Sequence, residues 1–94
     1  MEEIKKPFEI ELPPDKADGT YANMVVISHS PSEIIIDFAR IMPGLPKARV
    51  QARIIMTPQH AKGLLKTLEE NLKKYEAQFG EIKFPKGEEK RVGF

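Results

Sequence analysis

Two histidines and the polar residues beside them are the side chains best suited to catalysis. His29 lies in the run Ser28-His29-Ser30, and a serine next to a histidine can act as a nucleophile when a carboxylate orients the imidazole. Asp37 is the candidate orienting group, but we expect it well along the next strand, too far from the turn to reach His29. His60 falls in the first turn of a predicted helix, where the helix dipole disfavours a protonated imidazole, so packing or capping is its expected role.

Other recognisable chemical sites are absent from the sequence. It contains no phosphate-binding loop, GxGxxG turn, EF-hand loop or HExxH helix. Zero cysteines exclude disulfides, thiolate metal sites and thiol nucleophiles, and fit a reducing compartment. A metal site built on both histidines would need a carboxylate beside them, and nothing in the spacing of these residues requires such a metal site. We therefore predict no catalytic, cofactor-binding or metal-binding residues, and a protein that is not an enzyme.

Lys47, Arg49 and Arg53 form a second candidate site, because we expect them to collect on one face of a sheet. Basic side chains on a flat sheet can bind phosphates, whereas sheets that bind nucleic acid also carry aromatic residues for base stacking. This face offers Ile35 and Ile55 instead. A net charge of +1 also excludes the general positive field of a DNA-coating protein. Nucleic-acid binding through these residues is therefore the alternative function, less expected than a face that is solvated or contacts another subunit.

The chain is short enough that its hydrophobic core must be thin. It has 94 residues and a mass of 10.7 kDa, with 40% hydrophobic and 31% charged residues, which is typical of one globular domain. Such a domain buries about 60–65% of the surface that its unfolded chain exposes, so a partner subunit is an expected source of further burial. The sequence has neither a signal-peptide pattern nor the ~18 apolar residues of a membrane span. We expect a cytoplasmic protein with no membrane partner.

Three strands are predicted from residue types and alternation. Residues 21–28 are rich in β-branched and aromatic residues and carry apolar side chains on both faces. Residues 33–40 contain three consecutive isoleucines that favour a strand, although Ser30-Pro31 and the spacing of the apolar residues also fit an amphipathic helix. Residues 47–56 alternate most cleanly. Pairing the last two strands with their apolar side chains on one face places Asp37 opposite Gln51.

A helix is predicted from residue 58 to about residue 79. Thr57 is a favourable N-cap, Pro58 a favourable first helical residue, and Gly80 a common residue at a helix end. One side of the helix carries a heptad pattern of apolar residues, called here the leucine seam: Ala61, Leu65, Leu68, Leu72, Tyr75 and Phe79, widened by Leu64. The leucine seam fits either a coiled-coil dimer or packing on the protein's own sheet. Because it spans under three heptads, packing on the sheet is the preferred interpretation.

The ends of the chain show less pattern than the middle. Residues 1–20 contain four turn-forming residues, Pro7, Pro13, Pro14 and Gly19, and are predicted to form a flexible arm. Within this arm, residues 8–12 either form an edge strand or stay unstructured. Residues 21–80 are predicted to form the single domain. Residues 81–94 are charged and contain glycine, which predicts a mostly disordered tail.

Several short motifs lie between residues 19 and 80: Tyr21-Ala22-Asn23, Ser30-Pro31-Ser32-Glu33, Asp37-Phe38, Met42-Pro43-Gly44 and Met56-Thr57-Pro58-Gln59-His60-Ala61-Lys62. In these motifs the chain resembles a family of small prokaryotic proteins catalogued as domain of unknown function 3467. The resemblance implies a strand meander closed by one long helix. It implies no activity, cofactor or catalytic residue, because the family has none established, and it does not extend to the N-terminal arm or the C-terminal tail.

These patterns together predict an α+β fold, in which an antiparallel meander of three or four strands packs against one long C-terminal helix. A helix about 10 Å wide cannot cover strands that span about 14–19 Å, so we expect a homodimer that buries the remaining sheet surface. The candidate interface combines aliphatic residues with pairable charges: Met24, Val26, Ile35, Asp37, Arg49, Arg53 and Ile55. The predicted function is a non-enzymatic, oligomeric protein-interaction module, with room for a further, unidentified protein partner.

Overall fold

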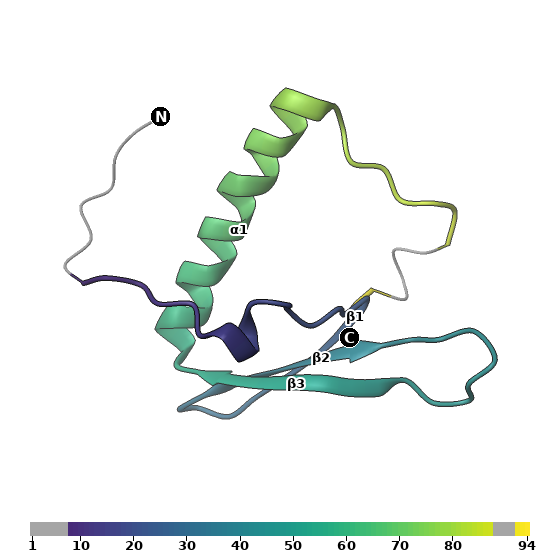
Figure 1. Ribbon diagram of the computed structural model, residues 1–94, viewed down its shortest axis with the longest axis horizontal. Coiled ribbons are helices and arrows are strands. Elements are labelled where there is room, and N and C mark those ends of the chain that lie inside the picture. Colours follow the sequence, from purple (N-terminus) through teal and green to yellow (C-terminus); the bar gives the residue numbers. More distant parts are fainter. Residues whose placement is uncertain (1–7, 88–91) are drawn as a thin grey trace.

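The computed structural model describes residues 8–87 and 92–94, which contain a three-stranded sheet and a long helix (Figure 1). Met24–His29 (β1), Ile34–Arg40 (β2) and Arg49–Met56 (β3) pair antiparallel in the order β1-β2-β3. The 22-residue helix Pro58–Phe79 (α1) follows β3, and a short 3-10 helix, Pro14–Lys16, precedes the sheet. The predicted α+β class, a strand meander followed by one long helix, is confirmed.

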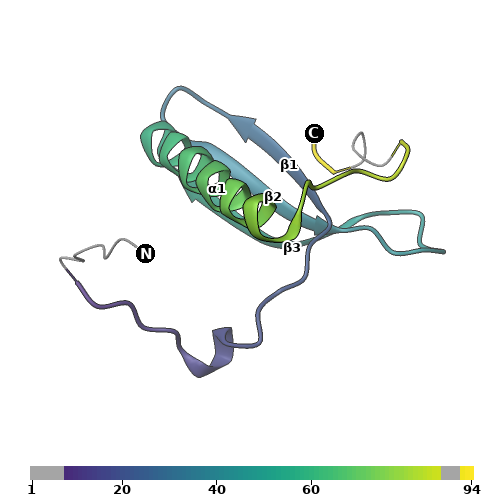
Figure 2. The ribbon, with the colours of Figure 1, turned by 90° about the horizontal axis from the view of Figure 1, so that it is seen from above.

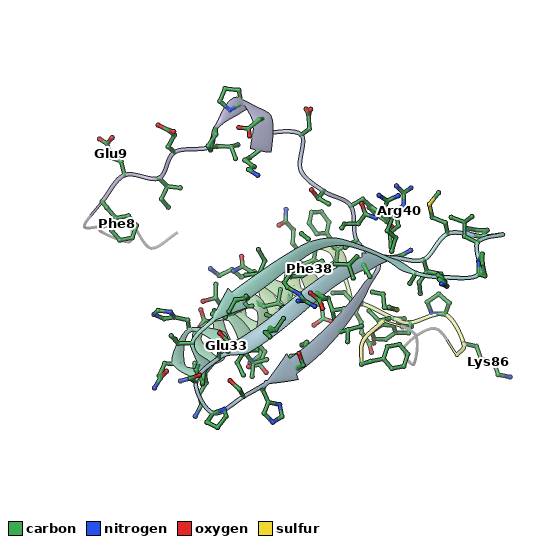
Figure 3. The ribbon with its side chains drawn as sticks, turned by 90° about the horizontal axis from the view of Figure 1, so that it is seen from below. Phe8, Glu9, Glu33, Phe38, Arg40 and Lys86 are labelled. Carbon is green, nitrogen blue, oxygen red and sulfur yellow. The ribbon has the colours of Figure 1, made fainter. Side chains whose placement is uncertain are left out.

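The optional fourth strand of the sequence analysis is wrong. Residues 8–12 lie outside the sheet, and Figure 3 shows Phe8 and Glu9 far from the strands. The reason is the pair of prolines that follows, because the backbone turns at once into the short 3-10 helix, where Lys16 N donates to Pro13 O over 2.9 Å. The arm therefore leaves the sheet instead of extending its edge.

β2 is the central strand and carries the buried core. Its isoleucines are stiff, β-branched residues that fit a pleated surface better than a helix, and Ser30 N donates to Glu33 O over 3.0 Å to close the tight turn that leads into it. Among the described residues, the buried hydrophobic side chains are Ile36 (6% exposed) and Ala39 (1% exposed). The core of the single chain is therefore small and is confined to the middle of the sheet.

The pairing of β2 with β3 differs from the predicted register by two residues. Asp37 lies opposite Arg53 instead of Gln51, and a β-bulge interrupts the ladder between Phe38 and Ala39. On the Met56 side of the bulge, a shift of two residues leaves each side chain on its predicted face, because side chains alternate along a strand with a period of two. Alternation alone therefore fits both registers equally well, and the observed register is the one that pairs opposite charges directly across the strands.

α1 has both of its predicted ends. The Thr57 hydroxyl accepts a hydrogen bond from His60 N at 3.2 Å, and Pro58 is the first helical residue. Gly80 ends the helix with a φ of 102°, a left-handed conformation in which glycine avoids the clash of a Cβ atom. The prediction of a helix from Pro58 to Phe79 is confirmed.

The leucine seam is open to solvent in the single chain. α1 rises from the end of β3 in Figure 1 and passes over the sheet in Figure 2, without extended contact to any strand. All of α1 lies within the described residues, and none of them is buried. Leu64, Leu65, Leu68, Leu72, Tyr75 and Phe79 are 41–66% exposed. The preferred interpretation, that the chain's own sheet covers the seam, is corrected: a single residue, Thr57, joins β3 to α1, and the helix rises at an angle from the sheet instead of lying flat against it (Figure 1).

Residues 92–94 pair with the outer edge of β1. Val25 N donates to Val92 O and Ile27 N donates to Phe94 O, both at 2.8 Å, and Phe94 N donates to Val25 O at 2.9 Å. The pairing is parallel and centres on Val25 and Gly93. The charged, glycine-containing sequence of the tail did not predict this contact, while residues 88–91 of the tail lie outside the described residues.

Candidate functional site

The register gathers most of the candidate interface residues on one face of the sheet. Val26 lies opposite Asp37, and Asp37 lies opposite Arg53, so these three form one row across the strands. Side chains directly opposite one another in antiparallel strands share a face. By the same pairing, one face carries Met24, Val26, Ile35, Asp37, Arg53 and Ile55, a set called here the ion-pair face.

Asp37 and Arg53 form a bidentate ion pair at the centre of this face. Arg53 Nε donates to Asp37 Oδ1 at 2.6 Å, and Arg53 Nη2 donates to Asp37 Oδ2 at 2.9 Å. The Asp37 side chain is 12% exposed and that of Arg53 is 61% exposed. The hydrogen bonds from Arg53 lower the pKa of Asp37 below its ordinary value. Partial burial of the carboxyl raises this pKa by a smaller amount, and the positive charge of Arg53 lowers it further. The same pair raises the pKa of Arg53, so both groups are charged at neutral pH.

The surroundings of the ion pair are aliphatic. Ile35 lies opposite Ile55 in a neighbouring row, and Ile55 is 55% exposed. An apolar area around a satisfied, two-pronged charge pair resembles the centre of a protein interface more closely than a catalytic site. The ion-pair face is therefore chemically suited to contact with another polypeptide.

Lys47 and Arg49 do not join Arg53 in a basic patch. Lys47 is exposed in the loop between β2 and β3. Arg49 lies opposite Arg40, and alternation along β2 puts Arg40 on the face opposite to that of Asp37. The reason is the β-bulge, which adds a residue to β3 and reverses its alternation beyond that point. The prediction that Arg49 shares a face with Arg53 is corrected, and the three cations of the alternative nucleic-acid contact are divided between the loop and the two faces of the sheet.

Neither histidine belongs to a catalytic arrangement in the described part of the chain. His29 lies opposite Ile34, and Asp37 lies opposite Val26. Asp37 is thus three rows away, or about 10 Å along the strands, and on the other face. His60 contributes its backbone N–H to the helix cap through Thr57. The expectation that Asp37 lies too far away to orient His29 is confirmed, and the bond from His60 involves its backbone and not its imidazole.

The described residues, 8–87 and 92–94, contain neither a cluster of metal ligands nor a membrane-spanning helix. This part of the chain holds no group of three His, Cys, Asp or Glu residues positioned for a metal ion. α1 is too polar to cross a membrane, and the same described ranges offer no other helix that could.

Asn23 and Tyr21, two motif residues that were not assigned a role, make contacts at the end of the sheet. The Asn23 side chain accepts a hydrogen bond from Ile41 N at 2.7 Å and donates one to Ile41 O at 3.0 Å. It thereby imitates one more backbone rung between β1 and β2. The Arg40 guanidinium lies over the Tyr21 ring, 5.2 Å from its centroid. The frequent use of asparagine to imitate backbone pairing is the signal that could have identified this role.

Three of the motifs quoted from the sequence contain a residue that stabilises the fold. Asn23 extends the ladder, Asp37 binds Arg53 across β2 and β3, and Thr57 caps α1. Searches of curated proteins and of solved structures gave no significant match. A family model described as "Protein of unknown function (DUF3467)" matches residues 1–84, so the match includes the N-terminal arm that the motif resemblance left out. The match spans most of the chain, which therefore belongs to this family of proteins of unknown function.

Proposed function

We propose that the protein is a non-enzymatic protein-interaction module that works as a homo-oligomer, with a two-fold dimer as its basic unit. The observation that supports this proposal is that the single chain buries few of its hydrophobic residues and leaves many of them exposed. Ile36 and Ala39 are the hydrophobic residues buried among those described, while 22 large hydrophobic residues remain exposed. A soluble monomer rarely leaves a contiguous apolar area of more than a few hundred Å² open.

Half of the exposed large hydrophobic residues lie on two surfaces that a second polypeptide can cover. The first is the leucine seam along α1. The second is the sheet, where Ile55 on the ion-pair face and Ile27 on the opposite face are 55% and 51% exposed. Both faces of the sheet keep exposed aliphatic residues. The helix α1 lies over only one face and does not bury the aliphatic residues of the sheet.

The outer edge of β1 offers less to a partner than the faces of the sheet do. β1 already pairs along part of its outer edge with residues 92–94 of the same chain. We therefore favour assembly through side-chain surfaces over pairing of a partner strand with the edge of β1. The nucleic-acid alternative has weaker support, because Arg53 is committed to Asp37 and because Lys47 and Arg49 lie apart from it.

Light scattering coupled to size exclusion tests the proposal. We expect the wild-type protein at micromolar concentration to have at least twice the 10.7 kDa mass of one chain. The double substitution Ile35→Asp with Ile55→Asp should weaken assembly by charging the ion-pair face. Thr20→Asp with Gln59→Asp is the matched control, since both residues are exposed and lie outside the two surfaces. A wild-type mass of one chain would overturn the proposal, and an unchanged mass for the first variant would exclude the ion-pair face from the contact.

A further inference from the structure

We infer that two copies of this chain meet along the leucine seam, with their α1 helices antiparallel about a two-fold axis. The inference rests on the proposed function, since it names the surface and the geometry of self-association. α1 has 22 residues and is about 33 Å long at a rise of 1.5 Å per residue. Its seam runs from Ala61 to Phe79, exposes its large side chains, and is free of extended contact with the chain's own strands.

The sizes of the seam residues fit an antiparallel pair. When Leu68 of one copy packs against Leu72 of the other, the same alignment sets Leu65 against Tyr75 and Ala61 against Phe79. The smallest seam residue then meets a large aromatic ring, and each layer is filled by side chains of complementary size. In a parallel pair each residue meets its own copy, so that Ala61 leaves a gap and the Phe79 rings crowd one another.

The charges beside the seam favour the same orientation. Lys62, Glu69 and Glu76 follow one flank at intervals of seven residues. In the antiparallel pair this flank faces its own copy, so Lys62 of each chain lies beside Glu76 of the other at both ends of the contact. Glu76 is already held at the end of α1, where its Oε2 accepts a hydrogen bond from Ile82 N at 2.9 Å. Opposite charges at both ends therefore align the two helices.

A parallel pair lacks this complementarity. Its flanking contacts would join Glu69 to Leu64 and Glu76 to Asn71 of the other copy, with no opposite charges between them. The antiparallel pair has one unfavourable contact, because the two copies of Glu69 face each other close to the two-fold axis. That contact supplies a diagnostic substitution.

Thiol cross-linking distinguishes the two orientations, because the chain has no cysteine of its own. Two variants, Lys62→Cys and Glu76→Cys, are prepared separately, and a third sample is made by unfolding and refolding them together. Each sample is treated with a short bismaleimide. In antiparallel dimers of the Lys62→Cys variant alone, the thiols are separated by about 24 Å along the helix axis, at 1.5 Å per residue. We expect cross-linked dimer from the mixed sample and none from either variant alone.

Glu70→Cys is the matched control, since Glu70 lies on the side of α1 away from the seam and should not cross-link. A second measurement compares Glu69→Gln with Glu70→Gln. Removing the repulsion at the axis should tighten the dimer about two- to fivefold for Glu69→Gln, and Glu70→Gln should leave it unchanged.

Cross-linking of each single variant alone would overturn the antiparallel arrangement. A dimeric mass without cross-links in any sample would place the contact elsewhere and overturn this inference, while the proposed oligomer would stand. A mass of one chain would overturn both.

Discussion

β2 and α1 show opposite relations between local sequence signals and burial. β2 has an ambiguous sequence that also fits a helix, yet it lies between two partner strands and holds the buried residues Ile36 and Ala39. α1 has the clearest signals in the chain, with a capping threonine, a proline at its start and a terminal glycine, yet contains no buried residue. Local signals thus determine where an element forms, whereas burial depends on what the rest of the chain, or another chain, places against it.

The largest expected effect comes from charging the leucine seam. The double substitution Leu68→Asp with Leu72→Asp should abolish assembly, because four carboxylates per dimer would enter the centre of an apolar contact. Thr67→Asp with Ala77→Asp adds the same charge on the outer side of α1 and should leave assembly intact. Light scattering reports the mass of each variant. Equal masses for the two variants would remove the seam from the interface.

Truncating a core residue of β2 should lower stability less than loss of assembly does, but more than any change at the helix ends. Ile36→Ala removes most of a buried side chain, and we expect the free energy of unfolding to fall by about 2–5 kcal/mol. Urea unfolding followed by circular dichroism measures it. Ile27→Ala is the matched control, since Ile27 lies opposite Ile36 but is half exposed. An equal loss for both variants would show that a partner covers the sheet face which they share.

The fold was largely predictable, because its elements depend on local chemistry. The cap at Thr57, the turn at Ser30 and the alternation of β3 each depend on residues close together in sequence. The register was not predictable, because two registers satisfy the same alternation and a β-bulge has no strong sequence signal.

The candidate site was predicted in part, because only some of its features depend on local sequence patterns. The ion-pair face depends on alternation and was expected, except for Arg49, which lies beyond the bulge. The exposure of the leucine seam was missed, because a heptad pattern is the same whether the helix packs within its own chain or against another. The contact of residues 92–94 with β1 was missed because three residues carry too little pattern.

The N-cap of α1 is a local signal whose contribution to stability can be measured separately from burial. Thr57→Ala removes the hydroxyl that accepts the hydrogen bond from His60 N and should lower stability by about 0.5–2 kcal/mol. Thermal unfolding monitored by circular dichroism measures the loss. Thr57→Ser keeps the hydroxyl and should retain most of the stability. If Thr57→Ala has no effect, the cap seen here does not contribute to helix formation.

The smallest expected effect is a change in acid stability at the ion pair. Because the pKa of Asp37 is lowered in the folded state, the pair stabilises the protein above the unfolded pKa of about 3.9 and loses that contribution as the pH falls through the lowered folded value. Asp37→Asn should therefore flatten the dependence of stability on pH below about 5. Unfolding midpoints between neutral and acid pH check this. Glu33→Gln, on an acid outside the pair, should preserve the wild-type slope, and a wild-type slope for Asp37→Asn would contradict the role of the pair.

The concentration dependence of unfolding tests the central claim, that the chain completes its hydrophobic core only in an assembly. When folding and association are coupled, mass action raises the midpoint of unfolding as the protein concentration increases. We predict a steady rise of the thermal midpoint over a hundredfold range of wild-type concentration, and loss of that rise in the Leu68→Asp, Leu72→Asp variant. A cooperative transition with the same midpoint at every concentration, from a species of 10.7 kDa, would contradict the account.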